Sequence, residues 1–564
     1  MTSMTDLFVI EAPGKLRAFH DALRKLGRNG EVVATLGHVF DNPRSLRPLA
    51  IKVLSDGGVV ETHRSPSKPV PYRRLLAAIR NATRIYLATD ADSEGGVIAQ
   101  DVWTLARREN PGAAVLRMHF SAMDADSIGR ALASAKEPHV DEAVPGSARR
   151  IADRIIAAAF SDFERGIYVG RVQTALLGLV AAGAVRRRTA IVPLRAADGG
   201  ADFVLRCEVP GNVRDDEVHG LSEMVGPVEA GDLRRVAVAP PLDGADALLA
   251  LEAEVGLEID AAADLLQRLY EAAKISYPRT MGQGFSAEGS SCIASIAGAR
   301  AVTAFQRASL PRVAEDAAHE ALRPLSPHVD LSTPLGLRKS TSDAAMGLIG
   351  RRCVATGLLQ TVQDGWSDRL PSWASEGTLS RVVVSCGVPW VVNRPGFAVR
   401  NRSPQAALVA AMKASGIGRP STYARHAMVL VSRGLVTPDL GLTDKGAAAL
   451  QAAPSQLRSS SAAADFESAL QSGGQLPHVL RDAMGALGCE HLLGDVVVKA
   501  KRVPIAAWGA LMGRGTDAKS GAVPKAPIGE EAAPFEEAGR ASNEVVDADY
   551  QLDEDDAPSY QFRP

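Results

Sequence analysis

The N-terminal part of the chain alternates between strand-like and helix-like segments, and this alternation constrains the fold more than any other feature. DLFVIEA and EVVATLGHV are typical of strands, whereas KLRAFHDALRKL between them has the apolar spacing of an amphipathic helix. A further strand, RIYLATD, leads into a helical stretch, GVIAQDVWTLARR. Alternating strands and helices favour a parallel sheet with helices packed on it. We therefore expect an α/β domain over residues 1–135.

Two β-like regions further along the chain bracket a mainly helical block. FVLRCEVP and RRVAVAP form the first region, and LSRVVVSCGVPWVVN forms the second. This order predicts one domain inserted into another. The expected boundaries are 136–195 with 400–500 for a helical domain, 196–245 with 365–399 for a β-rich unit, 246–364 for the inserted helical domain, and 501–564 for a linker and disordered acidic tail.

Composition restricts the function classes without selecting one. The 564 residues have a net charge of -2, but eleven Asp and Glu against two Arg from Glu530 onward give the tail -9, which leaves +7 for the rest. A mildly basic body is compatible with nucleic-acid binding. The five cysteines form no C-x-x-C pair, so no zinc ribbon is expected. No apolar run is long enough for a membrane span, and we expect a cytoplasmic protein without membrane partners.

Carboxylates gather where the strand RIYLAT runs into DADSEGG. Asp90, Asp92 and Glu94 occupy alternate positions there, and alternate positions of an extended chain point the same way. Glu11 ends the first predicted strand, so the four carboxylates can converge. Oxygen-only ligands of this kind suit Mg²⁺.

A calcium loop is the sharpest rival interpretation of DADSEGG, because acids stand at its first, third and fifth positions, Gly95 at the sixth and Asp101 at the twelfth. An EF-hand needs a helix entering the loop, whereas IYLAT is β-branched and aromatic. A plain solvated acidic turn is a further alternative.

The segment ISYPRT places a tyrosine two residues before an arginine. By itself, Tyr277 is more commonly a half-buried tyrosine whose hydroxyl finds a backbone partner, and a nucleophile is the alternative interpretation. A tyrosine pKa near ~10 makes the hydroxyl a poor nucleophile at neutral pH unless a cation such as Arg279 lies close.

Six motifs occur together in one order: VIEAPGK with TLGHVFDNP, DADSEG, ARRIADR with GRVQTALL, ISYPRT, AHEALRP and GIGRPSTYA. In order and approximate spacing the chain resembles the type IA DNA topoisomerases from about residue 6 to about residue 446. The resemblance implies a toroidal, multidomain α/β plus α fold: an N-terminal Toprim domain, domains with winged-helix character, and a β arch that carries the tyrosine domain as an insertion.

The same resemblance implies an ATP-independent isomerase that cuts one DNA strand, holds its 5′ phosphate on Tyr277 and passes another strand. It implies that Asp90, Asp92 and less certainly Glu94 hold Mg²⁺, together with Glu11. Protonated Glu11 would return a proton to the leaving 3′ oxygen, Arg279 would stabilise the phenolate or the phosphate, and Lys15 and His319 would contact the phosphate. The partner would be DNA, especially single-stranded or negatively supercoiled DNA, bound by a monomer.

Further residues are implied as DNA contacts by their places in GRVQ, AHEALRP and GIGRPST: Arg171, Gln173, Arg323, Gly418, Arg419, Ser421 and Thr422. In GIGRPST, Ser421 or Thr422 can also cap the following helix, whose N-terminus would suit a phosphate. Arg149, Arg150 and Arg154 in ARRIADR are interpreted as a basic helix face.

The chain departs from the family's usual D-x-D-R-E-G-E pattern, with Ser93 in place of the arginine and Gly96 in place of the last acid. Met281 and Gly282 replace the usual Asp-Ser after YPRT. Two other function classes therefore stay open: an inactive clamp for single-stranded DNA, and another Toprim enzyme such as a primase or nuclease. The motifs divide between the topoisomerase I and III branches, and a chromosomal or plasmid-associated bacterial role is not distinguished.

Overall fold

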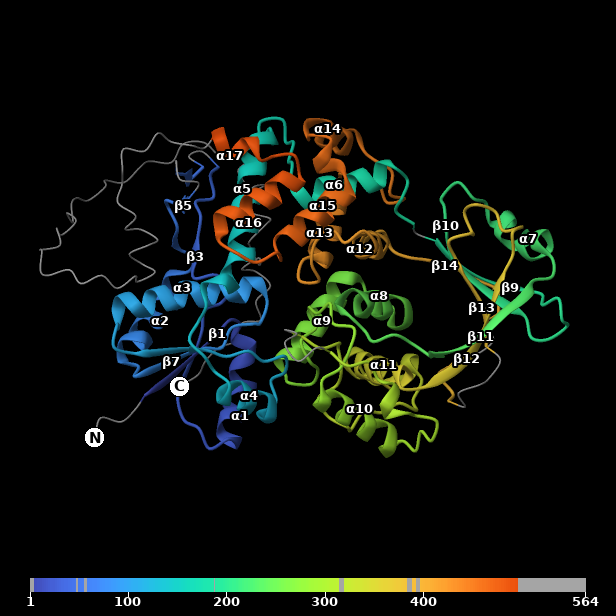
Figure 1. Ribbon diagram of the computed structural model, residues 1–564, viewed down its shortest axis with the longest axis horizontal. Helices are drawn as coiled ribbons and strands as arrows, with labels where there is room; N and C mark the ends of the chain where they lie inside the picture. The colour runs from blue at the N-terminus through green and yellow to red at the C-terminus, as the bar shows by residue number, and fades with distance from the viewer. Residues whose placement is uncertain are drawn as a thin grey trace, which may run out of the picture.

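The computed structural model describes residues 5–46, 49–54, 58–186, 188–313, 319–382, 388–391 and 396–495. Its N-terminal unit is a parallel sheet in the order β2-β1-β7-β8 with helices on both faces (Figure 1). The elements of this unit are β1 (Asp6–Ile10), α1 (Leu16–Lys25), β2 (Glu31–Ala34), α2 (Pro69–Asn81), β7 (Arg84–Leu87), α3 (Ser93–Glu109), β8 (Ala114–Arg117) and α4 (Ala125–Ala133). The predicted α/β layer is confirmed.

Burial explains the apolar run from Leu7 to Ile10 in β1: all five residues of the strand are buried, as expected for a central strand covered on both faces. Val9 pairs with Leu87 in the parallel register of β1 and β7. The carboxyl ends of both strands therefore meet at one edge of the sheet, where Glu11 and the DADSEGG loop follow.

An excursion between β2 and α2 carries two small antiparallel pairs, β3 (Phe40–Asp41) with β6 (Ser65–Pro66) and β4 (Ile51–Val53) with β5 (Val59–Glu61). Short 3-10 turns complete the connections. These are η1 (Pro13–Lys15), η2 (Val140–Ala143), η3 (Arg307–Ser309), η4 (Leu335–Leu337) and η5 (Gln456–Arg458).

A helical block joins two distant parts of the chain. α16 packs on α5, and α15 packs on α6 and α16. The block consists of α5 (Val144–Phe160), α6 (Arg171–Ala181), α12 (Pro404–Ala414), α13 (Tyr423–Ser432), α14 (Asp444–Ala452), α15 (Ser460–Ala469), α16 (Leu476–Ala486) and α17 (His491–Asp495). After α13, Val436 bridges to Leu442, a short hairpin where the sequence suggests a wing.

The β-rich unit is one antiparallel sheet in the order β11-β12-β13-β10-β9-β14, and α7 (Asp215–Val225) packs against it. Its strands are β9 (Arg188–Leu194), β10 (Phe203–Val209), β11 (Glu229–Ala237), β12 (Leu359–Trp366), β13 (Thr378–Val382) and β14 (Ala398–Asn401). Strands from both flanks of the central block share this sheet, so the block between them is an insertion. β9 and most of β12 lie outside the expected ranges of 196–245 and 365–399.

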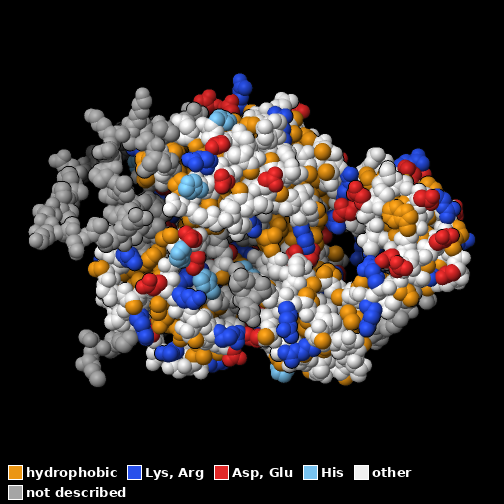
Figure 2. Space-filling view, viewed as in Figure 1, with side chains coloured by type: hydrophobic (Ala, Val, Ile, Leu, Met, Phe, Trp, Pro, Cys, Tyr) orange, Lys and Arg blue, Asp and Glu red, His pale blue; other side chains and the backbone are white. Residues whose placement is uncertain are grey.

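The inserted block contains α8 (Gly244–Val255), α9 (Ile259–Glu271), α10 (Ala287–Ala299) and α11 (Thr341–Thr356). One apolar core runs without a break from Phe8 of the N-terminal sheet through Tyr277 to Leu408 of the helical block. The N-terminal unit, the inserted block and the helical block therefore pack against one another directly. In Figure 2 the β-rich lobe stands off from them, with a dark opening between.

The expected acidic tail lies outside the described residues. No helix among the described segments is long and apolar enough to cross a membrane.

Candidate active site

The acidic loop begins at the end of β7 and becomes the first turn of α3. Asp92 is the N-cap of α3, and its carboxylate accepts a hydrogen bond of 2.8 Å from the Gly95 N–H. Gly95 is required because a Cβ there would lie 2.1 Å from the Asp90 carbonyl oxygen. The expectation that the three acids share one face of an extended segment is therefore wrong: Glu94 is already helical, since Asp92 caps the helix before it.

Three charged side chains concentrate at the carboxyl edge of β1 and β7. Lys15, only 1% exposed, forms an ion pair with the buried Asp90. Burial, followed by the negative charge of Asp90, raises the pKa of Glu11 to about 7 against the opposing charge of Lys15. Lys15 is expected as a phosphate ligand, but in this structure its ammonium group neutralises Asp90.

Tyr277 reaches across from the inserted block to this edge. Its side chain is 1% exposed, and its hydroxyl donates a hydrogen bond of 2.7 Å to Oδ2 of Asp92. Its backbone N–H donates to the Ser121 carbonyl at 2.9 Å. The hydroxyl of Tyr277 thus bonds the acidic loop, and its backbone bonds another segment of the N-terminal unit.

The environment of Tyr277 keeps its phenol protonated in this state. Burial raises the pKa of Tyr277 well above its ordinary value, and Asp92 and Asp90 raise it further, while Arg279 lowers it. Burial would also raise the pKa of Asp92, yet the Gly95 N–H and the Tyr277 hydroxyl hold it below its ordinary value. Asp92 is therefore an ionised acceptor for the tyrosine proton.

His319 lies flat against the tyrosine, with ring centroids 4.5 Å apart and planes inclined by 31°. Burial lowers its pKa, and neither ring nitrogen has a hydrogen-bond partner among the described residues. A neutral imidazole with free nitrogens beside Tyr277 is well placed to meet a phosphate oxygen.

Tyr270 is a neighbour that sequence reasoning missed. Its ring packs edge-on against Tyr277 at 5.3 Å, and the Lys15 ammonium lies 5.0 Å from its centroid. The residue sits in LLQRLYEAAK on α9, where apolar spacing suggests only a core position. Its contact with Lys15 joins two units of the fold, and no local sequence pattern indicates such a contact.

Glu94 is held by partners away from Tyr277. His38 Nε2 lies 2.9 Å from its Oε2, and Arg149 Nη1 lies 3.4 Å from its Oε1. Burial would raise the pKa of Glu94, but the hydrogen bond and charge of His38, followed by Arg149, lower it overall. Glu94 is thus ionised and already satisfied by protein groups.

The donor chemistry of this edge fits a hard divalent cation. Glu11, Asp90 and Asp92 offer only oxygen ligands, and a bound cation would offset the charge of Asp90, which after burial is the next cause of the raised pKa of Glu11. The EF-hand interpretation is excluded, because strand β7 enters the loop and the Asp101 carboxylate is bound by Arg64 at 2.7 and 2.8 Å. The acidic site belongs to the N-terminal α/β domain.

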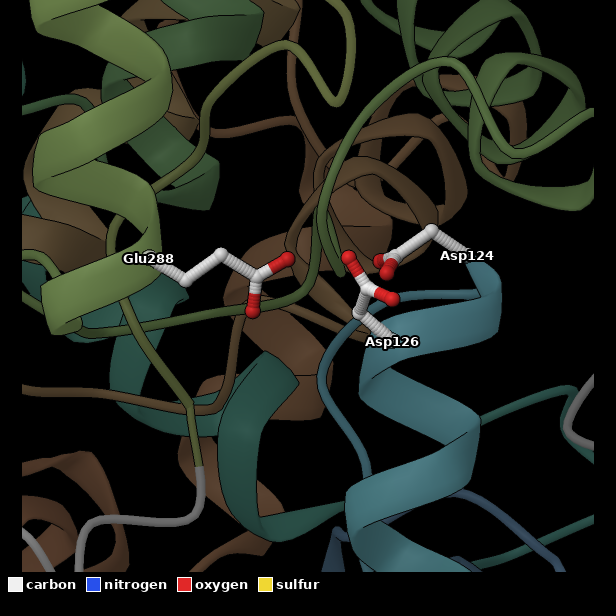
Figure 3. Close-up of side chains that lie close together, drawn as sticks. All are labelled: Asp124, Asp126 and Glu288. Atoms are coloured by element: carbon white, nitrogen blue, oxygen red, sulfur yellow. The ribbon is translucent and has the colours of Figure 1, made fainter.

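A second acidic group lies apart from this loop, where α4 faces the start of α10. Asp124, Asp126 and Glu288 point toward one another there, with ligand atoms within 4.8 Å (Figure 3). Arg130 pairs with Glu288 and Asp124 caps α4, so protein groups already engage part of this charge.

The expected DNA contacts divide into two sets by exposure. Arg171 is 3% exposed, and its guanidinium is committed to Asp153 at 3.0 Å and Glu467 at 2.7 Å. Gln173 is also buried, 6% exposed, and accepts from Arg433 at 3.2 Å, whereas Arg419 is 26% exposed and donates to Glu467 at 2.7 Å. A direct contact of Arg171 with DNA therefore requires one of its ion pairs to open.

Arg323 differs most from expectation. It is 2% exposed and pairs with Glu320 at 2.7 Å inside the inserted block, so it stabilises the AHEALRP turn instead of facing solvent. Gly418 has φ +74°, a left-handed conformation that suits glycine. Thr422 is the N-cap of α13 without a side-chain capping bond, so the predicted capping by Thr422 is wrong: its hydroxyl donates to the Arg419 carbonyl at 3.1 Å, and Ser421 precedes the cap.

Glu467 is the residue of greatest consequence that the sequence did not reveal. It is 5% exposed on α15 and binds Arg149, Arg171 and Arg419, which come from three separate segments. Burial would raise the pKa of Glu467, yet these three charges lower it to about 2. A lone glutamate in DFESAL has no local feature that predicts such a centre.

Close packing accounts for two departures from the family pattern. A Cβ at Gly96 would lie 2.4 Å from the Glu142 carbonyl oxygen, so an acid does not fit there while η2 holds this position. A Cβ at Gly282 would lie 2.7 Å from the backbone of Glu320. Neighbouring backbone therefore selects glycine at both positions.

Comparison with known proteins agrees with this geometry. Residues 6–123 match the Toprim domain model. DNA topoisomerase 1 of Aquifex aeolicus is 26% identical over 491 residues, 76% of this chain and 87% of the relative. Full-length topoisomerase I from Thermotoga maritima superposes with a TM-score of 0.60 at 19% identity, covering 88% of this chain and 91% of that one.

These matches support a type IA DNA topoisomerase architecture for this chain. Its similarity is unevenly spread: DNA topoisomerase 1 of Campylobacter jejuni is 28% identical over 181 residues, 31% of this chain, and the chain spans only 25% of that relative. The multidomain architecture with an N-terminal Toprim α/β domain, expected from the motifs, is confirmed.

Proposed function

We propose that this chain is a Mg²⁺-dependent, ATP-independent type IA topoisomerase that relaxes negatively supercoiled DNA or decatenates DNA by transient cleavage of one strand. The observation that carries this proposal is the hydrogen bond from Tyr277 to Asp92. It places a candidate nucleophile against the acidic loop of the Toprim domain, although the two residues lie 185 positions apart in sequence.

The residues divide the chemistry among them. The Tyr277 oxygen attacks the phosphorus of one strand and forms the phosphotyrosine bond, while the bond from phosphorus to the 3′ oxygen breaks. Asp92 is placed to accept the phenolic proton, and Glu11, whose raised pKa keeps it partly protonated near neutrality, is placed to donate a proton to the leaving oxygen. Arg279 and His319 stabilise charge on the phosphate.

Rejoining reverses these steps, and the phosphotyrosine bond retains the energy of the bond that was broken, so no nucleotide cofactor is needed. Glu11, Asp90 and Asp92 are the residues proposed to hold Mg²⁺, with Glu94 as a more distant carboxylate. Mg²⁺ there would offset phosphate charge and align the cut ends.

Single-stranded DNA is the proposed substrate segment. Arg419 is partly exposed beside Glu467 in the helical block, and phosphate contacts by such a group bind without reading sequence. The opening beside the β-rich lobe in Figure 2 is where we propose a second strand is held during passage.

Relaxation of negatively supercoiled plasmid with Mg²⁺ and no ATP tests this proposal. The wild type should change linking number in steps of one, and a chelator should stop it. Tyr277→Phe should abolish relaxation while it preserves binding of single-stranded DNA, because only the hydroxyl is lost.

Tyr86→Phe is the matched control, since Tyr86 is another buried tyrosine that stacks on Phe8 at 4.8 Å in the sheet core. It should relax plasmid like the wild type. Binding of single strands without relaxation by the wild type would instead support an inactive clamp.

A further inference from the structure

The acidic loop docks on helix α5 through close backbone contact. A Cβ at Gly146 of α5 would lie 2.5 Å from the Ser93 carbonyl oxygen, and the place of Gly96 against η2 is equally tight. The first turn of α3 therefore rests directly on the start of the helical block. Its position depends on residues outside the Toprim domain.

Arg149 of α5 provides the polar part of this contact. Its Nη1 donates to Ser93 Oγ at 2.9 Å and lies 3.4 Å from Glu94 Oε1. Its Nη2 donates to Glu467 at 3.2 Å. One guanidinium thus joins the acidic loop to the carboxylate that also holds Arg171 and Arg419.

Neither carboxylate depends on Arg149 alone. Glu94 keeps His38 and Glu467 keeps Arg171 and Arg419 when the guanidinium is removed. Loss of Arg149 should therefore leave both acids paired and the fold intact, while it releases the loop from α5. A variant without Arg149 therefore reports on the position of the loop and not on the stability of the whole fold.

We propose that Arg149 is a positioning residue that fixes the Ser93–Glu94 turn of the acidic loop and so sets how well the loop accepts Mg²⁺. The inference rests on the proposed function for its catalytic consequence. The loop has no basic residue of its own, because Ser93 stands between Asp92 and Glu94. Arg149 of α5 supplies the guanidinium that contacts Ser93 and Glu94.

Mg²⁺ titrations of the full chain test this role with two measurements, the Mg²⁺ concentration for half-maximal plasmid relaxation and the rise in Tm caused by Mg²⁺ without DNA. Arg149→Ala should raise the half-maximal concentration about tenfold or more, as loss of groups that orient metal ligands does. It should also shift the Tm response to higher Mg²⁺. The half-maximal Mg²⁺ concentration of Arg149→Lys should lie between those of the wild type and Arg149→Ala.

The most discriminating experiment restores a guanidinium from the acidic loop itself. Ser93→Arg added to Arg149→Ala should recover most of the Mg²⁺ response, because its side chain starts where Ser93 Oγ meets Arg149. Gly146→Ala should weaken the response without removing any charge, since it pushes on the Ser93 carbonyl.

Arg150→Ala is the matched control. Arg150 follows on the same helix and binds buried Glu61 at 2.7 Å. It should lower the Tm in the absence of Mg²⁺ but leave the Mg²⁺ response as in the wild type.

Equal Mg²⁺ responses in Arg149→Ala and Arg150→Ala, or no recovery on adding Ser93→Arg, would overturn the inference while leaving topoisomerase activity in place. A wild type that fails to relax plasmid would instead reject the proposed function, and the Tm titration would still decide the role of Arg149.

Discussion

Tyr277 and Asp92 show how chemistry at the scale of single residues depends on contacts between units. Burial, followed by the charges of Asp92 and Asp90, raises the pKa of Tyr277, so its phenol stays protonated in this state. The Asp92 carboxylate accepts its proton at 2.7 Å and is itself held ionised by the Gly95 N–H. In the proposed mechanism, transfer of the phenolic proton to Asp92 therefore requires the Toprim domain and the inserted block to be in contact.

Glu467 gives a prediction about pH at the same scale. Its pKa of about 2 in the folded chain lies below the ordinary value of 4.5, so its stabilising effect is complete above about pH 4.5 and is lost as pH falls toward 2. Glu467→Gln should lower the free energy of unfolding at neutral pH by about 3 kcal/mol, because buried arginines lose their partner. Its stability should also fall less steeply on acidification.

Circular dichroism melts between pH 7 and pH 3 measure both effects. Asp465→Asn on the exposed side of the same helix is the control and should melt like the wild type. Parallel pH profiles for Glu467→Gln and the wild type would contradict the assignment.

Helix α8 is the element that supports the tyrosine loop. The Gly244 N–H donates to the Thr280 carbonyl at 2.8 Å, and a Cβ on Gly244 would lie 2.6 Å from the Pro278 carbonyl oxygen. Gly244→Ala should therefore displace the loop and cost about 1–3 kcal/mol of stability from overpacking. DNA cleavage should fall more than tenfold, as small misplacements of reacting groups do.

Quantifying cleaved oligonucleotide and the Tm checks this prediction. Gly336→Ala is the control, because an added Cβ there meets nothing within 4 Å. Cleavage by Gly244→Ala at the wild-type level would show that α8 does not set the position of the loop.

Elements of strong periodicity were predictable from sequence, and the positions of side chains between elements were not. The apolar spacing of KLRAFHDALRKL correctly predicted α1, and IYLAT correctly predicted β7. The turn of Glu94 toward His38 was missed, because capping by Asp92 ends the extended segment early. Burial of Arg323 and the partners of Glu467 arise from packing of distant segments, which local patterns do not encode.

At the scale of the whole molecule, one chain crosses between units repeatedly. The sheet strands β9 to β11 precede the inserted block and β12 to β14 follow it, while α5 and α16 meet from opposite ends of the sequence. This threading lets the Toprim domain, Tyr277 and the Glu467 cluster meet in one region. The order of the six sequence motifs predicted the multidomain architecture. The bounds of the strands in the β-rich unit could be assigned only from their pairing in the sheet.

The acidic tail, which lies outside the described residues, gives a prediction about the whole chain. From Glu530 onward it carries -9 while the rest carries +7, so it can compete with DNA for basic groups. Deleting the residues after Lys525 should leave relaxation intact and tighten binding of single-stranded DNA at low salt, with the gain disappearing as salt rises. Fluorescence anisotropy across a salt series measures this affinity. Equal affinities of the full and the shortened chain at every salt concentration would contradict competition by the tail.

Covalent capture of DNA tests the central claim most directly. A single-stranded oligonucleotide labelled at its 3′ end, incubated with the protein and Mg²⁺ and then denatured, should move with the protein, whereas the same oligonucleotide labelled at its 5′ end should not. Tyr277→Phe should capture neither. Capture of the 5′-labelled strand, or capture that persists in Tyr277→Phe, would contradict a 5′ phosphate linkage through Tyr277.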